Sequence, residues 1–194
     1  MNSLLKRPGL VVLGVIVIII LVAAVVLAGS YNGFVTKDAA ADTQWAQVET
    51  QYQRRFDLIP NLVRASEAVM DQEVEVFKAL ADARSRYAGA ATPEQQAAAA
   101  NDVEGALSRL LVVVESYPQL KSSENVLAVQ AELAGTENRI SAERGRYNEA
   151  VLDYNLAVRR FPSSIAASVF GFGEREPFEA QAGTEQAPEA FTDR

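Results

Sequence analysis

The sequence contains no cysteine and no histidine. Disulfide bonds, thiolate nucleophiles, imidazole bases and the usual zinc ligands are therefore excluded. Carboxylates are the side chains that remain as candidate catalytic bases or metal ligands. Because a cysteine-free chain is at home on either side of a membrane, this absence does not identify the compartment. No glycine-rich phosphate-binding loop is present either.

Basic side chains are in deficit. The chain has 18 Lys and Arg against 25 Asp and Glu, which gives a formal net charge of −7. The first 30 residues hold Lys6 and Arg7 and no acid, so the remainder has 16 basic and 25 acidic side chains and a net charge of −9. An acidic domain repels phosphate backbones and anionic lipid headgroups. The sequence therefore predicts no binding to nucleic acid and no adhesion through a broad basic surface.

One segment has no charge at all, residues 9–29, with the sequence GLVVLGVIVIIILVAAVVLAG. As a helix it spans about 31 Å, the thickness of the hydrocarbon core of a bilayer. The alternative is a cleaved signal peptide with Val26-Leu27-Ala28 before the cleavage site. Signal peptides usually have an apolar region of about 7–15 residues, so the greater length here favours an uncleaved membrane anchor.

The orientation of this anchor is predicted from the few charges beside it. Lys6 and Arg7 precede the apolar segment, and Lys37 alone follows closely after it. Positive residues favour the cytoplasmic side. We therefore expect a single-pass protein of the plasma membrane or inner membrane with a cytoplasmic N-terminus and the residues from about 30 onward outside the cytoplasm.

Residues 31–87 carry a seven-residue repeat of apolar side chains, which is typical of one long amphipathic helix. Pro60 interrupts it. We expect Pro60 to bend this helix without ending it, because the apolar pattern continues beyond Ile59, which would be a poor cap for a new helix. The stripe comprises Trp45, Val48, Tyr52, Phe56, Ile59, Val63, Val69, Val76, Phe77 and Leu80.

Two further helices are predicted. Thr92-Pro93-Glu94 begins the second as a cap, a first-turn proline and an acid, and Tyr117-Pro118 ends it. A third helix follows and ends at Phe161-Pro162. The stripe of the second helix is Val103, Leu107, Leu110, Val114 and Tyr117, and that of the third is Val126, Leu133, Ile140, Tyr147, Tyr154 and Phe161.

Together these patterns predict an all-α protein, with an N-terminal transmembrane helix followed by an antiparallel bundle of long helices. The expected organisation is a short N-terminal segment (1–8), the transmembrane helix (9–29), the bundle (30–172) and an acidic tail (173–194). The tail carries six acids, two Gly and two Pro, and we expect it to be mobile, with Phe178 and Phe191 as docking points.

Polar side chains beside the apolar stripes are the candidate functional residues. Asn is costly within helices, so its presence there calls for hydrogen-bond partners. We favour a structural network of ion pairs and hydrogen bonds between helices; plain solvated charges and a partner-binding site are the alternatives. The residues are Arg55, Asp57, Pro60, Asn61, Glu115, Glu137, Asn138, Arg139, Tyr147, Asn148, Tyr154 and Asn155.

These segments also carry a family resemblance, because the chain is similar to the LemA family of bacterial membrane proteins over nearly its whole length. The residues that carry it, in order, are Tyr31-Asn32, Arg55-Phe56-Asp57-Leu58-Ile59-Pro60-Asn61-Leu62, Glu115-Ser116-Tyr117-Pro118, Gly135-Thr136-Glu137-Asn138-Arg139-Ile140, Tyr147-Asn148, Tyr154-Asn155 and Phe161-Pro162. The resemblance implies an N-terminal membrane helix and a helical bundle, without an established catalytic activity. Where family members often have His-Glu on the first long helix, this chain has Gln72-Glu73.

The sequence thus favours a membrane-anchored, non-enzymatic scaffold or interaction protein of the bacterial cell envelope, with no cofactor. Its expected partners are the membrane and either another protein or a second copy of the chain. One alternative is an ion-binding protein or enzyme that uses carboxylates alone, such as Glu73, Glu115 and Glu137. Another is a bundle that interacts with lipid and organises membranes, which the acidic charge of the domain argues against.

Overall fold

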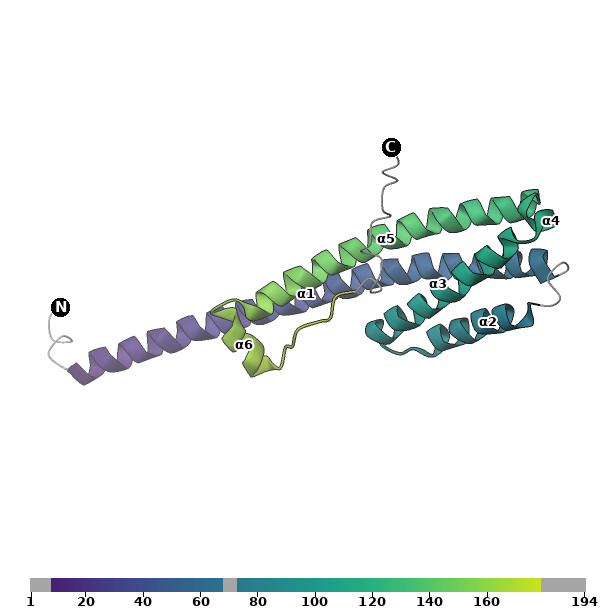
Figure 1. Cartoon of the computed structure of the whole chain (residues 1–194). Coiled ribbons are helices and arrows are strands. Elements are labelled where there is room, and N and C mark those ends of the chain that lie inside the picture. The colour runs from purple at the N-terminus through teal and green to yellow at the C-terminus, as the bar shows by residue number, and fades with distance from the viewer. Residues whose placement is uncertain (1–7, 68–72, 179–194) are drawn as a thin grey trace, which may run out of the picture. The chain divides into compact units, whose positions relative to one another are not determined.

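The computed structural model describes residues 8–67 and 73–178, and every regular element within these ranges is a helix (Figure 1). The predicted all-α class is confirmed. In chain order the helices are α1 (Pro8–Glu67), α2 (Val74–Gly89), α3 (Pro93–Glu115), α4 (Pro118–Lys121), α5 (Glu124–Arg159) and α6 (Ser163–Phe170). The chain divides into two compact units. The first unit is Met1–Asp42 with Glu149–Arg175, and the second is Thr43–Asn148 with Glu176–Arg194.

The first part of α1 is the candidate membrane span. It is long and apolar enough to cross a membrane, and its most apolar stretch is not buried inside the protein. Leu10, Ile18 and Val25 are among its exposed side chains. A core helix of a soluble protein would bury such residues, whereas a membrane span exposes them to lipid.

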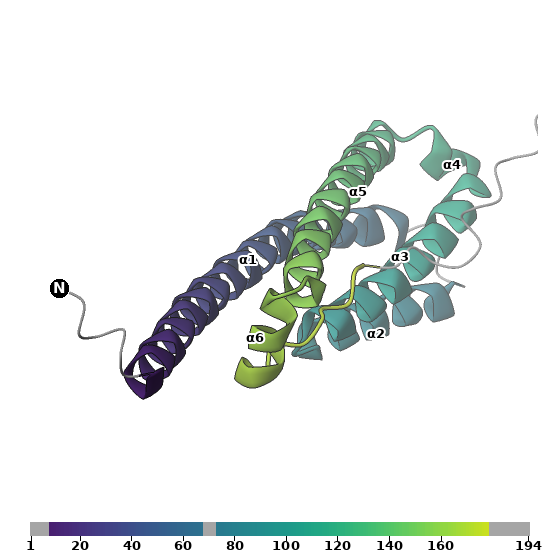
Figure 2. The same cartoon turned by 90° about the vertical axis from the view of Figure 1, so that its left-hand side faces the viewer.

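In the rest of the first unit, the end of α5 and the whole of α6 pack against α1 (Figure 2). Sequence periodicity did not predict α6, because eight residues are too few to show a repeat. The helix ends at Phe170 and is followed by Gly171, whose φ of 77° is left-handed and therefore suits glycine. The buried cluster is Phe34, Tyr154, Val158, Ala166 and Ala167.

Phe161 corrects one prediction about this region. The sequence placed it in the apolar stripe of the third helix, but its side chain is 82% exposed. The cause is the end of α5 at Arg159, because a residue beyond the helix end no longer follows the helical repeat. The earlier members of that stripe, from Val126 to Tyr154, are buried as predicted.

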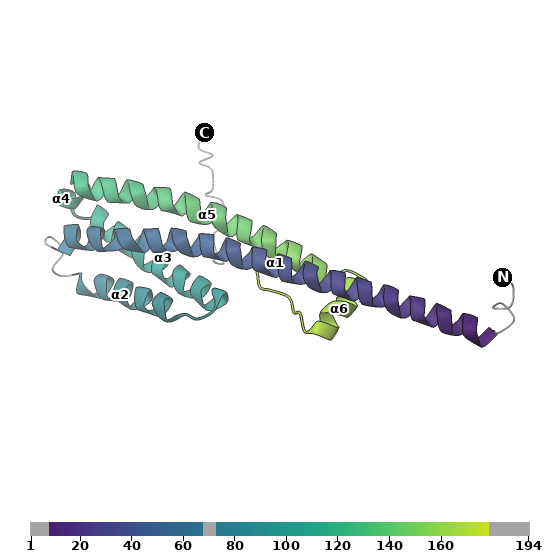
Figure 3. The ribbon, with the colours of Figure 1, turned by 180° about the vertical axis from the view of Figure 1, so that it is seen from behind.

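The second unit is a helical bundle whose long segments come from α1, α2, α3 and α5, and it also contains the short helix α4 (Figure 3). Helices α1 and α5 run antiparallel within it, since Trp45 lies against Tyr147 while Arg55, farther along α1, meets Glu137, earlier on α5. Helix α2 packs along α3. The core of the second unit contains Trp45, Val48, Tyr52, Phe56, Ile59, Leu62, Leu80, Val103, Leu107, Leu110, Val114, Val126, Leu133, Ile140 and Tyr147.

The prediction of one helix over residues 31–87 is wrong. Helix α1 ends at Glu67, α2 begins at Val74, and the Tyr87 ring then lies 4.7 Å from the Phe56 ring. In one straight helix these two residues would be about 46 Å apart. The chain therefore turns back so that the two halves of the stripe face each other. Val69, part of the predicted stripe, and Gln72 lie outside the described residues.

Two local predictions are confirmed at least in part. Helix α1 continues through Pro60 to Glu67, so the proline does not end it, while the bend expected at Pro60 stays a prediction. At the start of α3 the Thr92 hydroxyl accepts a hydrogen bond of 3.3 Å from the backbone N–H of Gln95, and Pro93 occupies the first turn. The short helix α4 then occupies the connection between α3 and α5, which the sequence left without structure.

Candidate functional site

A charged network crosses the interior of the second unit. Its first pair joins Arg55 on α1 to Glu137 on α5, two of the residues that the sequence singled out. The Arg55 side chain is only 9% exposed, whereas that of Glu137 is 46% exposed. The guanidinium is thus held inside the bundle and the carboxylate at its edge. The Arg55 Nε is buried without a hydrogen-bond partner among the described residues, so Glu137 is its main compensation.

A second pair, in which both side chains are largely buried, was not predicted from the sequence. Arg144 on α5 donates through Nη2 to Glu104 on α3 at 2.6 Å, and its Nε donates to the Tyr52 hydroxyl on α1 at 3.0 Å. Its guanidinium carbon also lies 4.2 Å from the centre of the Phe178 ring. One side chain therefore links three helices. The available signal was Tyr52, since a tyrosine within a core stripe needs a partner for its hydroxyl.

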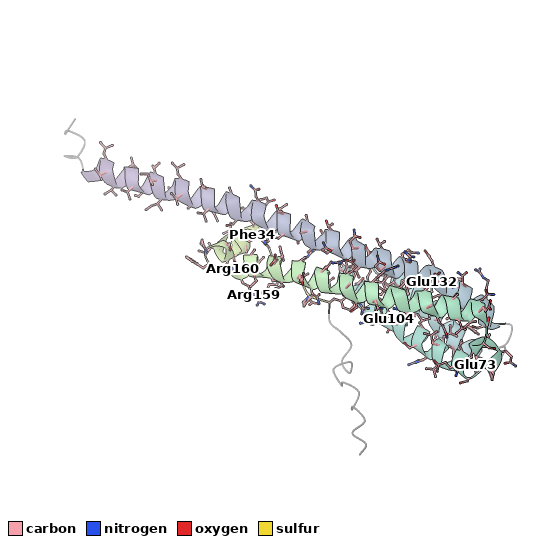
Figure 4. The ribbon with its side chains drawn as sticks, turned by 90° about the horizontal axis from the view of Figure 1, so that it is seen from above. Phe34, Glu73, Glu104, Glu132, Arg159 and Arg160 are labelled. Carbon is pink, nitrogen blue, oxygen red and sulfur yellow. The ribbon has the colours of Figure 1, made fainter. Side chains whose placement is uncertain are left out.

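Burial controls the electrostatics of this pair. It raises the pKa of Glu104 above its usual value, and the charge of Arg144 opposes that shift without cancelling it. Burial also raises the pKa of the Tyr52 hydroxyl. The Tyr87 hydroxyl, near Glu49, has its pKa raised to about 12, again mainly by burial. Figure 4 labels Glu104 within the bundle. The arrangement is suited to cross-linking helices, because each carboxylate in it is occupied by a guanidinium.

Other predicted polar residues lie on the surface. Asp57 accepts a hydrogen bond of 2.9 Å from Gln53, and Asn61 accepts one of 2.6 Å from Arg64, both within α1. Pro60 between them is half-buried. The remaining three of this group, Glu115, Asn138 and Arg139, are exposed. The structure therefore brings together Arg55 and Glu137 and leaves these neighbours facing outward.

The first Tyr-Asn pair binds the backbone of the C-terminal segment in the second unit. The Asn148 amide donates to the carbonyl of Phe178 at 3.0 Å and accepts from the N–H of Phe178 at 2.7 Å. The Tyr147 hydroxyl donates to the carbonyl of Glu176 at 3.4 Å. Phe178 is buried, stacked 6.5 Å from the Trp45 ring. The docking expected of Phe178 is thus observed, while Phe191 lies outside the described residues.

The second Tyr-Asn pair repeats this arrangement in the first unit. The Asn155 amide donates to the carbonyl of Arg175 at 2.8 Å and accepts from its N–H at 2.9 Å. The Tyr154 hydroxyl donates to the carbonyl of Gly173 at 2.9 Å. The Arg175 side chain in turn meets Asp38 on α1 at 3.3 Å. The prediction of a mobile tail from residue 173 onward therefore does not describe residues 173–178. The sequence showed both Tyr-Asn pairs but contained no signal for what they bind.

A groove of about 430 Å³ opens beside Trp45 in the second unit. Aromatic rings and prolines form its apolar lining, and two exposed carboxylates, those of Glu94 and Glu176, also line it. The lining residues are Trp45, Pro93, Glu94, Ala97, Ala98, Asn101, Tyr147, Glu176, Pro177 and Phe178.

The carboxylates proposed as an ion site are not assembled as one. Within residues 8–67 and 73–178 no group of three or more Asp, Glu, His or Cys is close enough to hold a metal ion. Glu73 accepts a hydrogen bond of 3.4 Å from the Tyr117 hydroxyl, and Glu137 pairs with Arg55.

Comparison with known proteins gives two findings. The LemA family is matched by residues 44–190. Two magnetosome proteins of Paramagnetospirillum magneticum, MamQ 1 and MamQ 2, are each 27% identical to this chain over 88% of its length and 72% of theirs. Magnetosome protein MamQ of Magnetospirillum gryphiswaldense is also 27% identical, over 89% of this chain and 73% of its own.

Proposed function

Because this chain belongs to the LemA family, we propose that it is a membrane-anchored, non-enzymatic scaffold of the bacterial cell envelope that binds a protein partner. The family and the magnetosome relatives support a membrane-associated protein. In this proposal residues 9–29 span the membrane, residues 30–172 form the scaffold, and the scaffold lies outside the cytoplasm. The single observation that carries partner binding is the groove beside Trp45.

The chemistry of the groove indicates what it would bind. The groove exposes proline and alanine side chains from the start of α3 together with Pro177, while Trp45, Tyr147 and Phe178 line it and are each 7% exposed or less. Apolar side chains left exposed in a concave surface favour contact with an apolar group of a partner. Glu94 and Glu176 place negative charge at the opening. The groove therefore suits a protein segment with an apolar side chain next to a basic one.

In-cell cross-linking tests this proposal. The chain has no cysteine, so Ala98→Cys places a single thiol in the groove for a heterobifunctional photo-crosslinker. Ala131→Cys, at an exposed position of α5, is the matched control. We expect one stoichiometric adduct from Ala98→Cys that the control does not give. Equal labelling of both positions, or no adduct from either, would remove the groove as a partner site.

An ion-binding or enzymatic role that uses carboxylates alone is the competing reading. The pairing of Glu104 with Arg144 and of Glu137 with Arg55 supports the structural role instead. Metal analysis of the full chain, purified without a tag or added metal, distinguishes the two. We expect less than stoichiometric metal, and a tightly held ion would favour the competing reading.

The orientation is a separate part of the proposal, supported by Lys6 and Arg7 on one side of the span and Lys37 on the other. A reporter that is active only outside the cytoplasm, fused after Arg194, should be active. A fusion that works only with a cytoplasmic reporter would reverse the topology while leaving the groove unaffected.

A further inference from the structure

Helix α6 has an exposed apolar side that the bundle does not use. Ala166 and Ala167 are buried against the first unit, while Ile165 and Val169 point outward and are 55% and 65% exposed. Its sequence, SSIAASVF, contains no charge. Phe161, just before the helix, is exposed as well. In water this arrangement leaves apolar area unburied, which is unfavourable because apolar surface is more stable away from water.

The place of α6 along α1 ties it to the candidate membrane span. The cluster that holds α6 also includes Leu27, which lies within the apolar segment, and Phe34, two turns beyond Leu27. These two positions are about 10 Å apart along a helix. Because Leu27 belongs to the span itself, α6 packs where α1 passes from hydrocarbon into the headgroup region.

Aromatic side chains gather at the same level. The Tyr31 ring lies 5.1 Å from that of Phe170 and 5.6 Å from that of Phe172, and the Phe34 ring lies 5.0 Å from that of Phe172. Tyrosine and other amphipathic aromatic side chains concentrate at membrane–water interfaces. This contact joins the end of α6 to the first residues of α1 beyond the span.

Charged residues stop where the apolar surface begins. Arg159, which pairs with Glu174, and Arg160 lie at the end of α5, before α6 starts. Figure 4 labels both of them near α6, and Phe34 between α6 and α1. Between Pro162 and Phe172 the chain carries no charge. A short uncharged helix beside a membrane span, whose nearest charged residues come before Pro162 and after Phe172, matches a bilayer better than a water-facing surface.

From these observations we propose that α6 is embedded in the interfacial layer of the membrane, with Ile165 and Val169 in contact with lipid. The occupant of this apolar face is the bilayer, because the opposite, buried side of α6 packs against α1 at the level of Leu27, which lies within the apolar segment whose other side chains are exposed. The helix thereby gives the chain a second membrane contact in addition to the span. The proposal goes beyond the scaffold function and does not depend on the groove in the second unit.

Spin labels on the full chain test this directly. Val169→Cys is labelled in nanodiscs of phosphatidylcholine that hold one chain each, and its accessibility to oxygen is compared with that to a water-soluble nickel complex. Val112→Cys on α3 is the matched control, since Val112 is 66% exposed, and Val15→Cys reports on the span. We expect Val169→Cys to resemble Val15→Cys, with oxygen favoured over nickel, and Val112→Cys to show the reverse.

Three outcomes would overturn the proposal. If Val169→Cys resembles Val112→Cys, α6 faces water. If the label at Val169→Cys is shielded from both reagents, protein covers α6 rather than lipid. If Val15→Cys also resembles Val112→Cys, the anchor itself is wrong and α6 loses its reason to lie in the membrane. The scaffold groove, in the second unit, is tested separately by the cross-linking at Ala98→Cys.

Discussion

Arg55 on α1 and Glu137 on α5 form an ion pair in which the cation is buried and the anion is half exposed. This asymmetry determines how much it costs to leave each side chain without its partner. An isolated Glu137 can be hydrated, whereas an isolated Arg55 is left desolvated without its counter-charge. Removing the carboxylate should therefore be more harmful than its own exposure suggests.

The first prediction follows from this asymmetry. Glu137→Ala should lower the free energy of unfolding by about 1–3 kcal/mol, because it leaves the buried Arg55 guanidinium unpaired. Denaturant unfolding of the full chain, followed by circular dichroism, measures the change. Glu132→Ala, at an exposed position of the same helix, is the control and should change stability by less than about 0.5 kcal/mol. Equal effects in the two variants would show that Arg55 finds another partner.

Removing the hydroxyl should lower the stability of the protein at one buried tyrosine and not at another. Tyr52→Phe removes the bond from Arg144 and should destabilise the protein by about 1 kcal/mol. Tyr87→Phe removes a buried hydroxyl that has no hydrogen-bond partner among the described residues, so it should leave stability unchanged or raise it. Thermal unfolding midpoints decide the matter. A clear loss in Tyr87→Phe would mean that its hydroxyl is bonded after all.

Stability should depend on pH through Glu104. Burial raises the pKa of Glu104 in the folded protein, so the folded state holds this proton more tightly than the unfolded state does. The contribution of Glu104 to the free energy of unfolding is therefore fully present below the usual carboxyl pKa of 4.5. It is lost as the pH rises through the raised pKa of Glu104 in the folded protein. Relative to Glu104→Gln, the wild type should be more stable near pH 4 than near pH 7.

Chemical unfolding of both proteins across that range tests the sign. Glu132→Gln serves as the control for removing one charge from an exposed position of α5. A wild type that gains stability over Glu104→Gln as pH rises would show that Arg144 outweighs burial at Glu104.

The Tyr-Asn pairs predict a local effect at the C-terminal segment. Asn155→Ala removes the acceptor for the N–H of Arg175, so that amide should exchange its hydrogen faster by about tenfold or more. Asn125→Ala, at an exposed position near the start of α5, should leave exchange at Arg175 unchanged. Hydrogen exchange read by mass spectrometry of fragments around Arg175 measures both. Unchanged exchange in Asn155→Ala would assign the protection to other contacts.

The sequence predicted those parts of the fold in which one apolar stripe decides the structure. The stripes from Val103 to Val114 and from Val126 to Tyr154 are buried, and the helix passes through Pro60. It did not predict the reversal between Glu67 and Val74, because a stripe continues equally well through one helix or through two that fold together.

The candidate site was predicted only in part, and for a related reason. Arg55, Glu137 and the Tyr-Asn pairs stood out because polar side chains beside a stripe need partners. Glu104 and Arg144 did not stand out, since a charge on an amphipathic helix is usually solvated and its burial depends on a neighbouring helix. Likewise, an asparagine that binds the backbone of a distant segment leaves no pattern in that segment, because any residue supplies the same N–H and carbonyl.

The pairing of α1 with α5 also bears on how the bundle avoids folding incorrectly. A seven-residue apolar repeat packs nearly as well after one helix slides by seven residues, so the stripes alone leave neighbouring alignments close in energy. Glu137 and Arg144 are seven residues apart on α5. A slide of that length would bring Arg144 to the place of Glu137, and Arg55 would then face a positive charge instead of its partner. The ion pair therefore distinguishes the native alignment from the misaligned one that the hydrophobic pattern would tolerate.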